Sequence, residues 1–222
     1  MLSSSAKLDS VEEDDVFPPG TTRAMAVLFT IGHGTRSLIE LAGLLDQSGV
    51  SRLVDVRRHP GSRRNPHLSR SVMAEELPGQ GVAYEWWGEE LGGRRATKSD
   101  SRHPAWRNES FRAYADHMDS PGFRQAFDRL LDGAAAQPTA VMCAETLWWR
   151  CHRRLLADAA VLKGWQVVHL MGGGQRQAHP AHPSMRTDQA GGPVYDLGAG
   201  ALWAPGTLPD GAPAGRHLDG HT

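Results

Sequence analysis

The segment 139–156, TAVMCAETLWWRCHRRLL, contains both cysteines of the chain beside acidic, imidazole and guanidinium groups. A thiol that ends a strand, faces a helix N-terminus and neighbours arginines has a lowered pKa and reacts as the thiolate. Cys143 fits this description, because residues 139–142 are typical of a buried strand and residues 151–163 carry apolar side chains at helical spacing. We therefore expect Cys143 to be a catalytic nucleophile. A small cysteine that is only packed in the core is the alternative.

Two further side chains are candidates for proton transfer. Glu145 lies two residues beyond Cys143, and His33 lies between Gly32 and Gly34. His33 and His152 both compete with Glu145 for this role, because imidazole has the more suitable unperturbed pKa. We expect Glu145 or His33 to act as the acid or base. A histidine that only makes structural hydrogen bonds, in a tight turn that needs glycine, is the alternative.

Arginines follow several of the predicted strands and could bind a phosphate, because the guanidinium group donates bidentate hydrogen bonds to anions. The alternative is a structural network in which Asp55, Glu89, Glu90 and Glu145 neutralise them, and Asp55 could orient Arg57 in this way. The predicted anion-binding residues are Arg57, Arg58, Arg63, Arg94, Arg95 and Arg153.

A metal site is another interpretation of the same segment. Cys143, Cys151 and His152 would supply three ligands, and His33 or His169 a fourth. Thiolates and imidazoles suit zinc or iron, but the two cysteines lack the second short-spaced pair of recognised zinc patterns. We therefore predict no cofactor, with zinc or iron only under this alternative.

These side chains need a scaffold, and the hydrophobic pattern supplies one. Helical patterns separate the apolar runs, and the first helix begins with a capping box formed by Ser37 and Glu40. This alternation predicts an α/β fold with a mostly parallel five-stranded sheet, helices on both faces and a single domain. The polar clusters all follow strands, so we expect them at one edge of the sheet. The predicted strands are 26–31, 50–56, 82–86, 139–143 and 166–171, and the predicted helices are 37–49, 69–77, two within 108–136, and 151–163.

Composition bounds the organisation and the location of the chain. The 222 residues, 40% of them hydrophobic, suit one α/β domain at 25–172. Residues 1–24 are acidic and proline-containing and are predicted to be disordered, and the Gly/Pro-rich residues 173–222 to form a poorly ordered tail. No apolar run is long enough for a membrane span and the N-terminus is unlike a signal peptide, so we predict a cytoplasmic protein with reduced thiols and no membrane partner.

The order of five motifs resembles that of a known family. TIGHGTRSL follows the first predicted strand, LVDVRRHPGSRRNP the second and ELGGRR the third, and MCAE and CHRRLLAD surround the cysteines. Over residues 29–170 the chain resembles the family called domain of unknown function 488. This resemblance implies a compact α/β fold and no settled biochemical activity.

These patterns lead to one main functional hypothesis and two alternatives. We expect an enzyme, or an enzyme-derived domain, that binds a phosphate-bearing small molecule such as a nucleotide, or a nucleic-acid end. The net charge of -1 excludes a globally basic nucleic-acid binder but permits a local basic patch. One alternative is a non-catalytic nucleic-acid-binding module whose paired tryptophans, Trp86–Trp87 and Trp148–Trp149, stack on bases. The other is the transition-metal protein.

Overall fold

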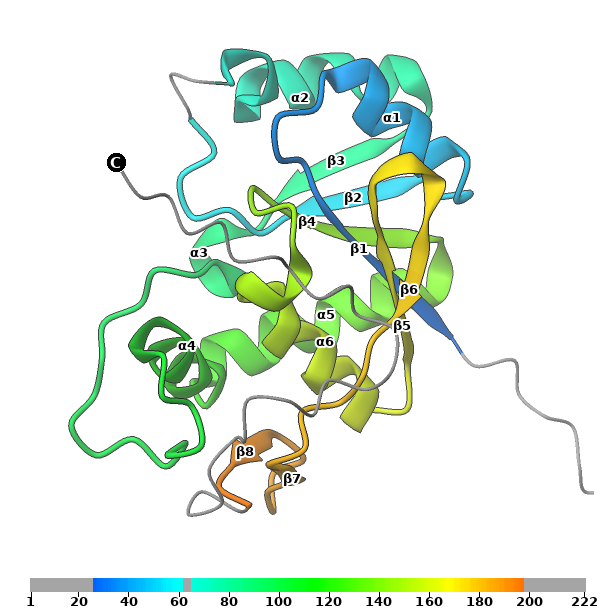
Figure 1. Cartoon of the computed structure of the whole chain (residues 1–222). Helices are drawn as coiled ribbons and strands as arrows, with labels where there is room; N and C mark the ends of the chain where they lie inside the picture. Colours follow the sequence, from blue (N-terminus) through cyan, green and yellow to red (C-terminus); the bar gives the residue numbers. More distant parts are fainter. Residues whose placement is uncertain (1–25, 62–64, 198–222) are drawn as a thin grey trace, which may run out of the picture.

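A computed structural model of the protein describes residues 26–61 and 65–197 (Figure 1). Its central sheet has the strand order β3-β2-β4-β1-β5-β6. The first five strands of the chain are parallel to one another, and β6 joins β5 in antiparallel orientation. The sheet strands are β1 (Val27–Gly32), β2 (Arg52–Asp55), β3 (Ala83–Trp86), β4 (Thr139–Cys143), β5 (Gln166–Leu170) and β6 (Arg176–Ala178), and a separate hairpin consists of β7 (Met185–Thr187) and β8 (Pro193–Tyr195).

Helices connect the parallel strands and begin at clear capping residues. The Ser37 side chain accepts from the Glu40 amide, and the Glu40 carboxylate accepts from the Ser37 amide, so the predicted capping box is present. Ser120 caps the helix that starts with Pro121. The α-helices are α1 (Leu38–Asp46), α2 (Arg70–Glu76), α3 (Gly88–Leu91), α4 (Glu109–Met118), α5 (Pro121–Ala136) and α6 (Arg153–Leu162), with 3-10 turns η1 (Pro66–Leu68), η2 (Pro78–Gln80), η3 (Trp148–Arg150) and η4 (Gly172–Gly174).

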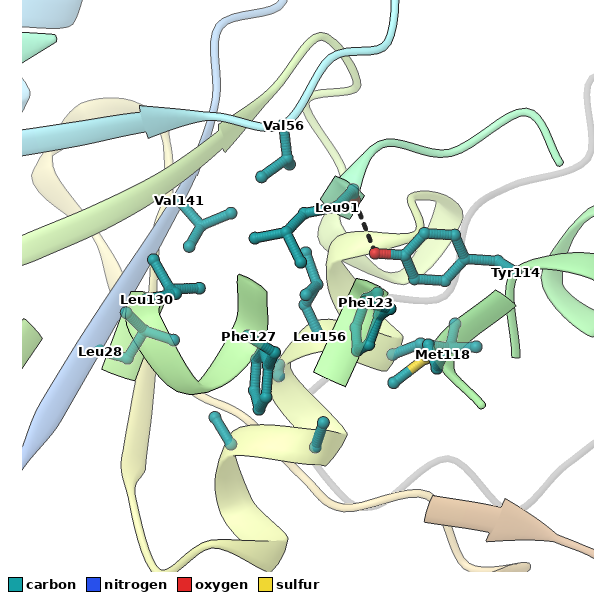
Figure 2. Packing of buried hydrophobic residues seen from close by; sticks show 14 of the residues in the cluster. Leu28, Val56, Leu91, Tyr114, Met118, Phe123, Phe127, Leu130, Val141 and Leu156 are labelled. Carbon is teal, nitrogen blue, oxygen red and sulfur yellow. Dashed lines mark hydrogen bonds between the residues drawn. The ribbon is translucent and has the colours of Figure 1, made fainter. Parts of the chain in front are cut away.

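The sheet is covered on both faces, because successive strand residues point to opposite sides. Val141 packs with α4, α5 and α6 in the larger hydrophobic cluster (Figure 2), whereas Met142 packs with α1 and α2 in the second cluster. Figure 1 shows the two groups of helices on opposite sides of the sheet. The predicted α/β fold, with a mostly parallel sheet and helices on both faces, is therefore confirmed, and the sheet has one strand, β6, more than the five predicted.

The predicted poorly ordered tail is wrong for residues 173–197, which form η4, β6 and the β7–β8 hairpin. This segment is held by tertiary contacts: the buried Tyr195 hydroxyl donates to the Asp158 carboxylate of α6 at 3.0 Å, and His179 Nε2 lies 3.0 Å from the same carboxylate. Residues 1–24, which are predicted to be disordered, and residues 198–222, the rest of the predicted tail, lie outside the described residues. Among the residues that the structure describes, no helix is long and apolar enough to cross a bilayer.

Candidate functional site

The carboxyl ends of three neighbouring strands bring the first site residues together. In the order β2-β4-β1, Arg57 follows β2, Cys143 ends β4 and His33 follows β1. The pairing continues past the strands, because the His33 amide donates to the Cys143 carbonyl at 2.9 Å and the Val56 amide donates to the Met142 carbonyl at 2.9 Å. The carboxyl-terminal edge of the sheet, where the sequence pattern predicts the site, is therefore continuous across β2, β4 and β1.

A pocket of about 330 Å³ opens at this edge, and we call it the cysteine pocket. It is formed by the segment after β2, the loop after α3, the start of α4 and the loop between β4 and α6. Its chemically active lining residues are Cys143, Glu145, Cys151, His59, His152, Arg57, Arg58, Arg94 and Arg150. The two thiols, a carboxylate and several guanidinium groups thus share a single cavity.

The two cysteines and His152 form a compact trio in this pocket. His152 Nδ1 lies 3.8 Å from Cys143 Sγ and 3.7 Å from Cys151 Sγ, and the three atoms all lie within 4.8 Å of one another. Gly93 makes room for the imidazole, because a Cβ at this position would approach Nδ1 to 2.9 Å. Both thiols are free and buried. The arrangement lets one sulfur carry a negative charge that the other two groups stabilise.

That charge belongs on Cys151. Burial alone would raise the pKa of the Cys151 thiol, but hydrogen bonds from Cys143 and His152 and the charges of His152 and Arg153 hold this pKa well below its usual value. The hydrogen bond with Cys151 and burial raise the pKa of Cys143 well above its usual value. Cys151 directly precedes the N-cap residue of α6, where the helix dipole also favours an anion. The pKa of Cys143 therefore shifts in the direction opposite to the one expected from the sequence, and the lower pKa of this interacting pair falls on Cys151.

Three of the predicted anion-binding arginines are used by the fold. Arg57 is buried and pairs with the Asp55 carboxylate, with its Nη2 at 2.6 Å, as the orienting role of Asp55 implied. Arg153 is only 1% exposed and donates from Nη2 to the Glu145 carbonyl at 2.6 Å. It therefore holds in place the segment 144–152 between β4 and α6, which we call the cysteine loop. Arg95 donates to the Gly92 and Glu89 carbonyls. Predicted Arg63 lies outside the described residues.

Three other arginines remain free to bind a ligand, and we call Arg58, Arg94 and Arg150 the pocket arginines. All three line the cysteine pocket, and within residues 26–61 and 65–197 none of them forms an ion pair. Arg94 and Arg150 are exposed, whereas Arg58 is half-buried. Burial lowers the pKa of Arg95, and the nearby positive charge of Arg58 lowers it further. The electrostatic potential beside Arg58 is therefore positive. Arg150 was missing from the predicted anion-binding set, although its position directly before Cys151 is a signal in the sequence that could have identified it.

Arg94 also has an unusual backbone. Its φ is 58°, and it is the single non-glycine residue with positive φ in the part of the chain that the structure describes. A side chain in this region costs about 1 to 2 kcal/mol, and such strain is concentrated at functional sites. The strained backbone holds a guanidinium group at the cysteine pocket, at a position where glycine would suit the backbone better.

His33 is a structural residue and does not line the pocket. Its Nδ1–H donates to the Gly34 carbonyl at 2.9 Å, and its Nε2 accepts from Arg57 Nη1 at 3.0 Å. Burial and the neighbouring Arg57 lower the pKa of His33 to about 4, so it is neutral at physiological pH. A Cβ on Gly32 would meet the Glu145 carbonyl at 2.0 Å, so the Gly32–Gly34 turn packs against the cysteine loop. Glu145, His152 and His59 are thus the acid–base candidates within the pocket.

The Trp148–Trp149 pair is explained only in part by the fold. Trp148 is buried and stacks on His169, with ring centroids 4.3 Å apart, and His169 Nε2 lies 3.0 Å from His179 Nδ1. His169 is therefore part of a buried histidine network and does not join the two cysteines. Trp149 is 41% exposed beside it. This network, which needs residues far apart in sequence, was not predicted.

Comparison with known proteins identifies one matching family, whose description names no activity. The family model described as Domain of unknown function DUF488 matches residues 37–160. No curated protein and no solved structure matches the chain significantly. The matched range includes both cysteines, His152 and the three pocket arginines.

Proposed function

Since the chain belongs to the family described as domain of unknown function DUF488, a description that names no reaction, we propose from its site that it is an enzyme that acts on a phosphate-bearing ligand through a cysteine thiolate. One observation carries this proposal. The trio of Cys143, Cys151 and His152 lines the same cavity as the pocket arginines, which have no carboxylate partners among the described residues. A nucleophile and an anion site in one pocket are the two components that such an enzyme needs.

Each group has a definite role in the proposed reaction. The pocket arginines bind the phosphate oxygens and neutralise their charge. The Cys151 thiolate attacks the electrophilic centre of the ligand, a bond from Sγ forms, and the bonding pair departs with the leaving group. Glu145 or His152 supplies a proton to that leaving group. In the second step water attacks the intermediate and gives a proton back to the same residue, while the bond to Sγ breaks and its electron pair returns to Cys151 as the thiolate. Glu145 is exposed, and among residues 26–61 and 65–197 its side chain accepts a single hydrogen bond, from the Leu147 amide to Oε1 at 3.3 Å, so it can reorient toward a ligand.

Replacing Arg94 by glycine separates the ligand role of this residue from its structural role. We expect Arg94→Gly to weaken the binding of inorganic phosphate about tenfold, because a charge-assisted hydrogen bond contributes about 1.5 to 3 kcal/mol. The free energy of unfolding should stay the same or rise by about 1 kcal/mol, because glycine removes the strain of a positive φ. Calorimetric titration with phosphate and urea unfolding measure the two quantities.

The matched control is Arg186→Gln, which removes an exposed charge on β7 outside the pocket. Its phosphate affinity should equal that of the unmodified protein at the same ionic strength. If Arg94→Gly and Arg186→Gln bind phosphate with equal affinity, the assignment of the pocket arginines is contradicted. The position of the lost charge would then make no difference to phosphate binding.

The same trio also favours a second function, a transition-metal centre. In a tetrahedral zinc site the nitrogen and sulfur ligands lie about 3.5 Å apart, close to the 3.8 Å and 3.7 Å seen here. The thiolate enzyme ranks first because His152 Nε2 is buried without a partner among the described residues, whereas a metal-bound imidazole normally donates from its second nitrogen. Elemental analysis of the chain purified without chelator decides: stoichiometric zinc or iron that is lost in Cys151→Ser would establish the metal centre, and metal-free protein would reject it.

A further inference from the structure

A second pocket adjoins the cysteine pocket. This outer pocket, of about 680 Å³, is lined by the segment after β2, the end of β3 and the start of α2. Arg58 and His59 line both pockets, so the two cavities meet along the segment after β2. A ligand that occupied both pockets would pass over Arg58 and His59.

The outer pocket contains a planar platform made by Arg70 and Trp86. The guanidinium carbon of Arg70 lies 4.2 Å from the centroid of the Trp86 ring. The indole is held in place, because its Nε1–H donates to the Arg57 carbonyl at 2.8 Å. Arg70 is exposed and forms no ion pair within the described ranges, so its outer face is available to a ligand.

This platform has the properties of a nucleobase site. Bases stack on aromatic rings and on the planes of guanidinium groups, and such stacking tolerates any base because every base has a π face. Pro60 and Ala74 add apolar surface to the lining. The cationic character of Arg70 and Arg58 also suits a ligand that carries negative charge close to its planar group.

We propose that the site binds a nucleoside phosphate, with its phosphate on the pocket arginines and its base on the Arg70–Trp86 platform. This inference rests on the proposed function and adds the class of substrate to it. The shared chemistry is a base joined to a phosphate through ribose or deoxyribose, and it occurs both in free mononucleotides and at the ends of nucleic-acid strands.

Calorimetric titration with three probes tests the inference. On the full chain we expect adenosine monophosphate to bind at least tenfold more tightly than ribose 5-phosphate, because only the former has a base. Arg70→Ala should lower the affinity for adenosine monophosphate about tenfold and leave the affinity for inorganic phosphate unchanged. Arg70 is an exposed residue of α2, so this variant should fold normally. Trp86→Phe keeps a stacking ring and should retain most of the affinity, whereas Trp149→Ala is the control outside both pockets.

The outcomes separate this inference from the proposed function. Equal affinities for adenosine monophosphate and ribose 5-phosphate would overturn the nucleoside site and leave the anion pocket standing. If neither of these compounds nor inorganic phosphate binds, both proposals fall. A single-stranded oligonucleotide with a terminal phosphate is the fourth probe. If it binds more tightly than the mononucleotide, with the same dependence on Arg70, it confirms the base site and identifies a nucleic-acid end as the source. Tighter binding without that dependence would reject the platform.

Discussion

Replacing Cys151 by serine should reduce the alkylation of the folded protein by iodoacetamide at pH 7 at least tenfold. Alkylation needs the thiolate, and the neighbours of Cys151 hold its pKa well below the usual value, so Cys151 should react faster than an ordinary cysteine. The same variant should also abolish turnover once a substrate is found. Mass spectrometry of the alkylated peptides measures the rate at each cysteine separately.

Cys143→Ser is the matched control for this prediction. A serine hydroxyl can still donate a hydrogen bond to the Cys151 thiolate, so this variant should keep most of the reactivity of the unmodified protein. The opposite result, with fast alkylation in Cys151→Ser and slow alkylation in Cys143→Ser, would place the nucleophile on Cys143, where the sequence pattern predicts it. Urea unfolding of both variants establishes that each one is folded.

Asp55→Ala should lower the free energy of unfolding by about 3 to 5 kcal/mol, because it leaves the Arg57 guanidinium buried without its partner. The Asp55 side chain is 0% exposed and accepts from Arg57 Nη2 at 2.6 Å and from the Tyr84 hydroxyl at 2.7 Å. Burial and Asp55 together raise the pKa of Tyr84, so the phenol remains a neutral donor to this carboxylate. Urea unfolding, monitored by circular dichroism, measures the loss.

The control for this change is Asp128→Ala, which breaks an exposed pair with Lys163 on the surface of α5. Because exposed ion pairs contribute about 0 to 1 kcal/mol, this variant should remain close to the unmodified protein. A similar small loss in Asp55→Ala would contradict the structural role of Arg57. Arg57 would then return to the set of arginines that are free to bind the ligand.

The sheet could be predicted because its information is local. Five short apolar runs alternate with helical patterns, and the capping box at Ser37 and Glu40 marks a helix start within four residues. The β7–β8 hairpin could not be predicted in this way. Its strands are three residues long and are held by Tyr195, which contacts Asp158 from 37 positions away. Contacts of this kind leave no periodic pattern in the sequence.

The position of the site could be predicted from the sequence, but the charge states of its residues could not. Parallel strands bring their carboxyl ends to one edge, so the positions of Cys143 and Arg57 follow from the topology. The charge state of each group depends on which neighbours it meets in three dimensions. Cys143 and His152 lower the pKa of the neighbouring Cys151, and Arg153 turns inward to the backbone carbonyl of Glu145. Neither fact follows from the spacing of the residues.

Protection of Cys151 by phosphate is the measurement that tests the central claim most directly. The rate of iodoacetamide alkylation at Cys151 should fall at least tenfold in saturating inorganic phosphate, and sodium chloride at equal ionic strength should leave it nearly unchanged. Phosphate bound by Arg58, Arg94 and Arg150 would occupy the cavity that the thiolate lines. An alkylation rate at Cys151 that is the same in phosphate and in chloride would contradict the account, because the thiolate and the anion site would then not share one pocket.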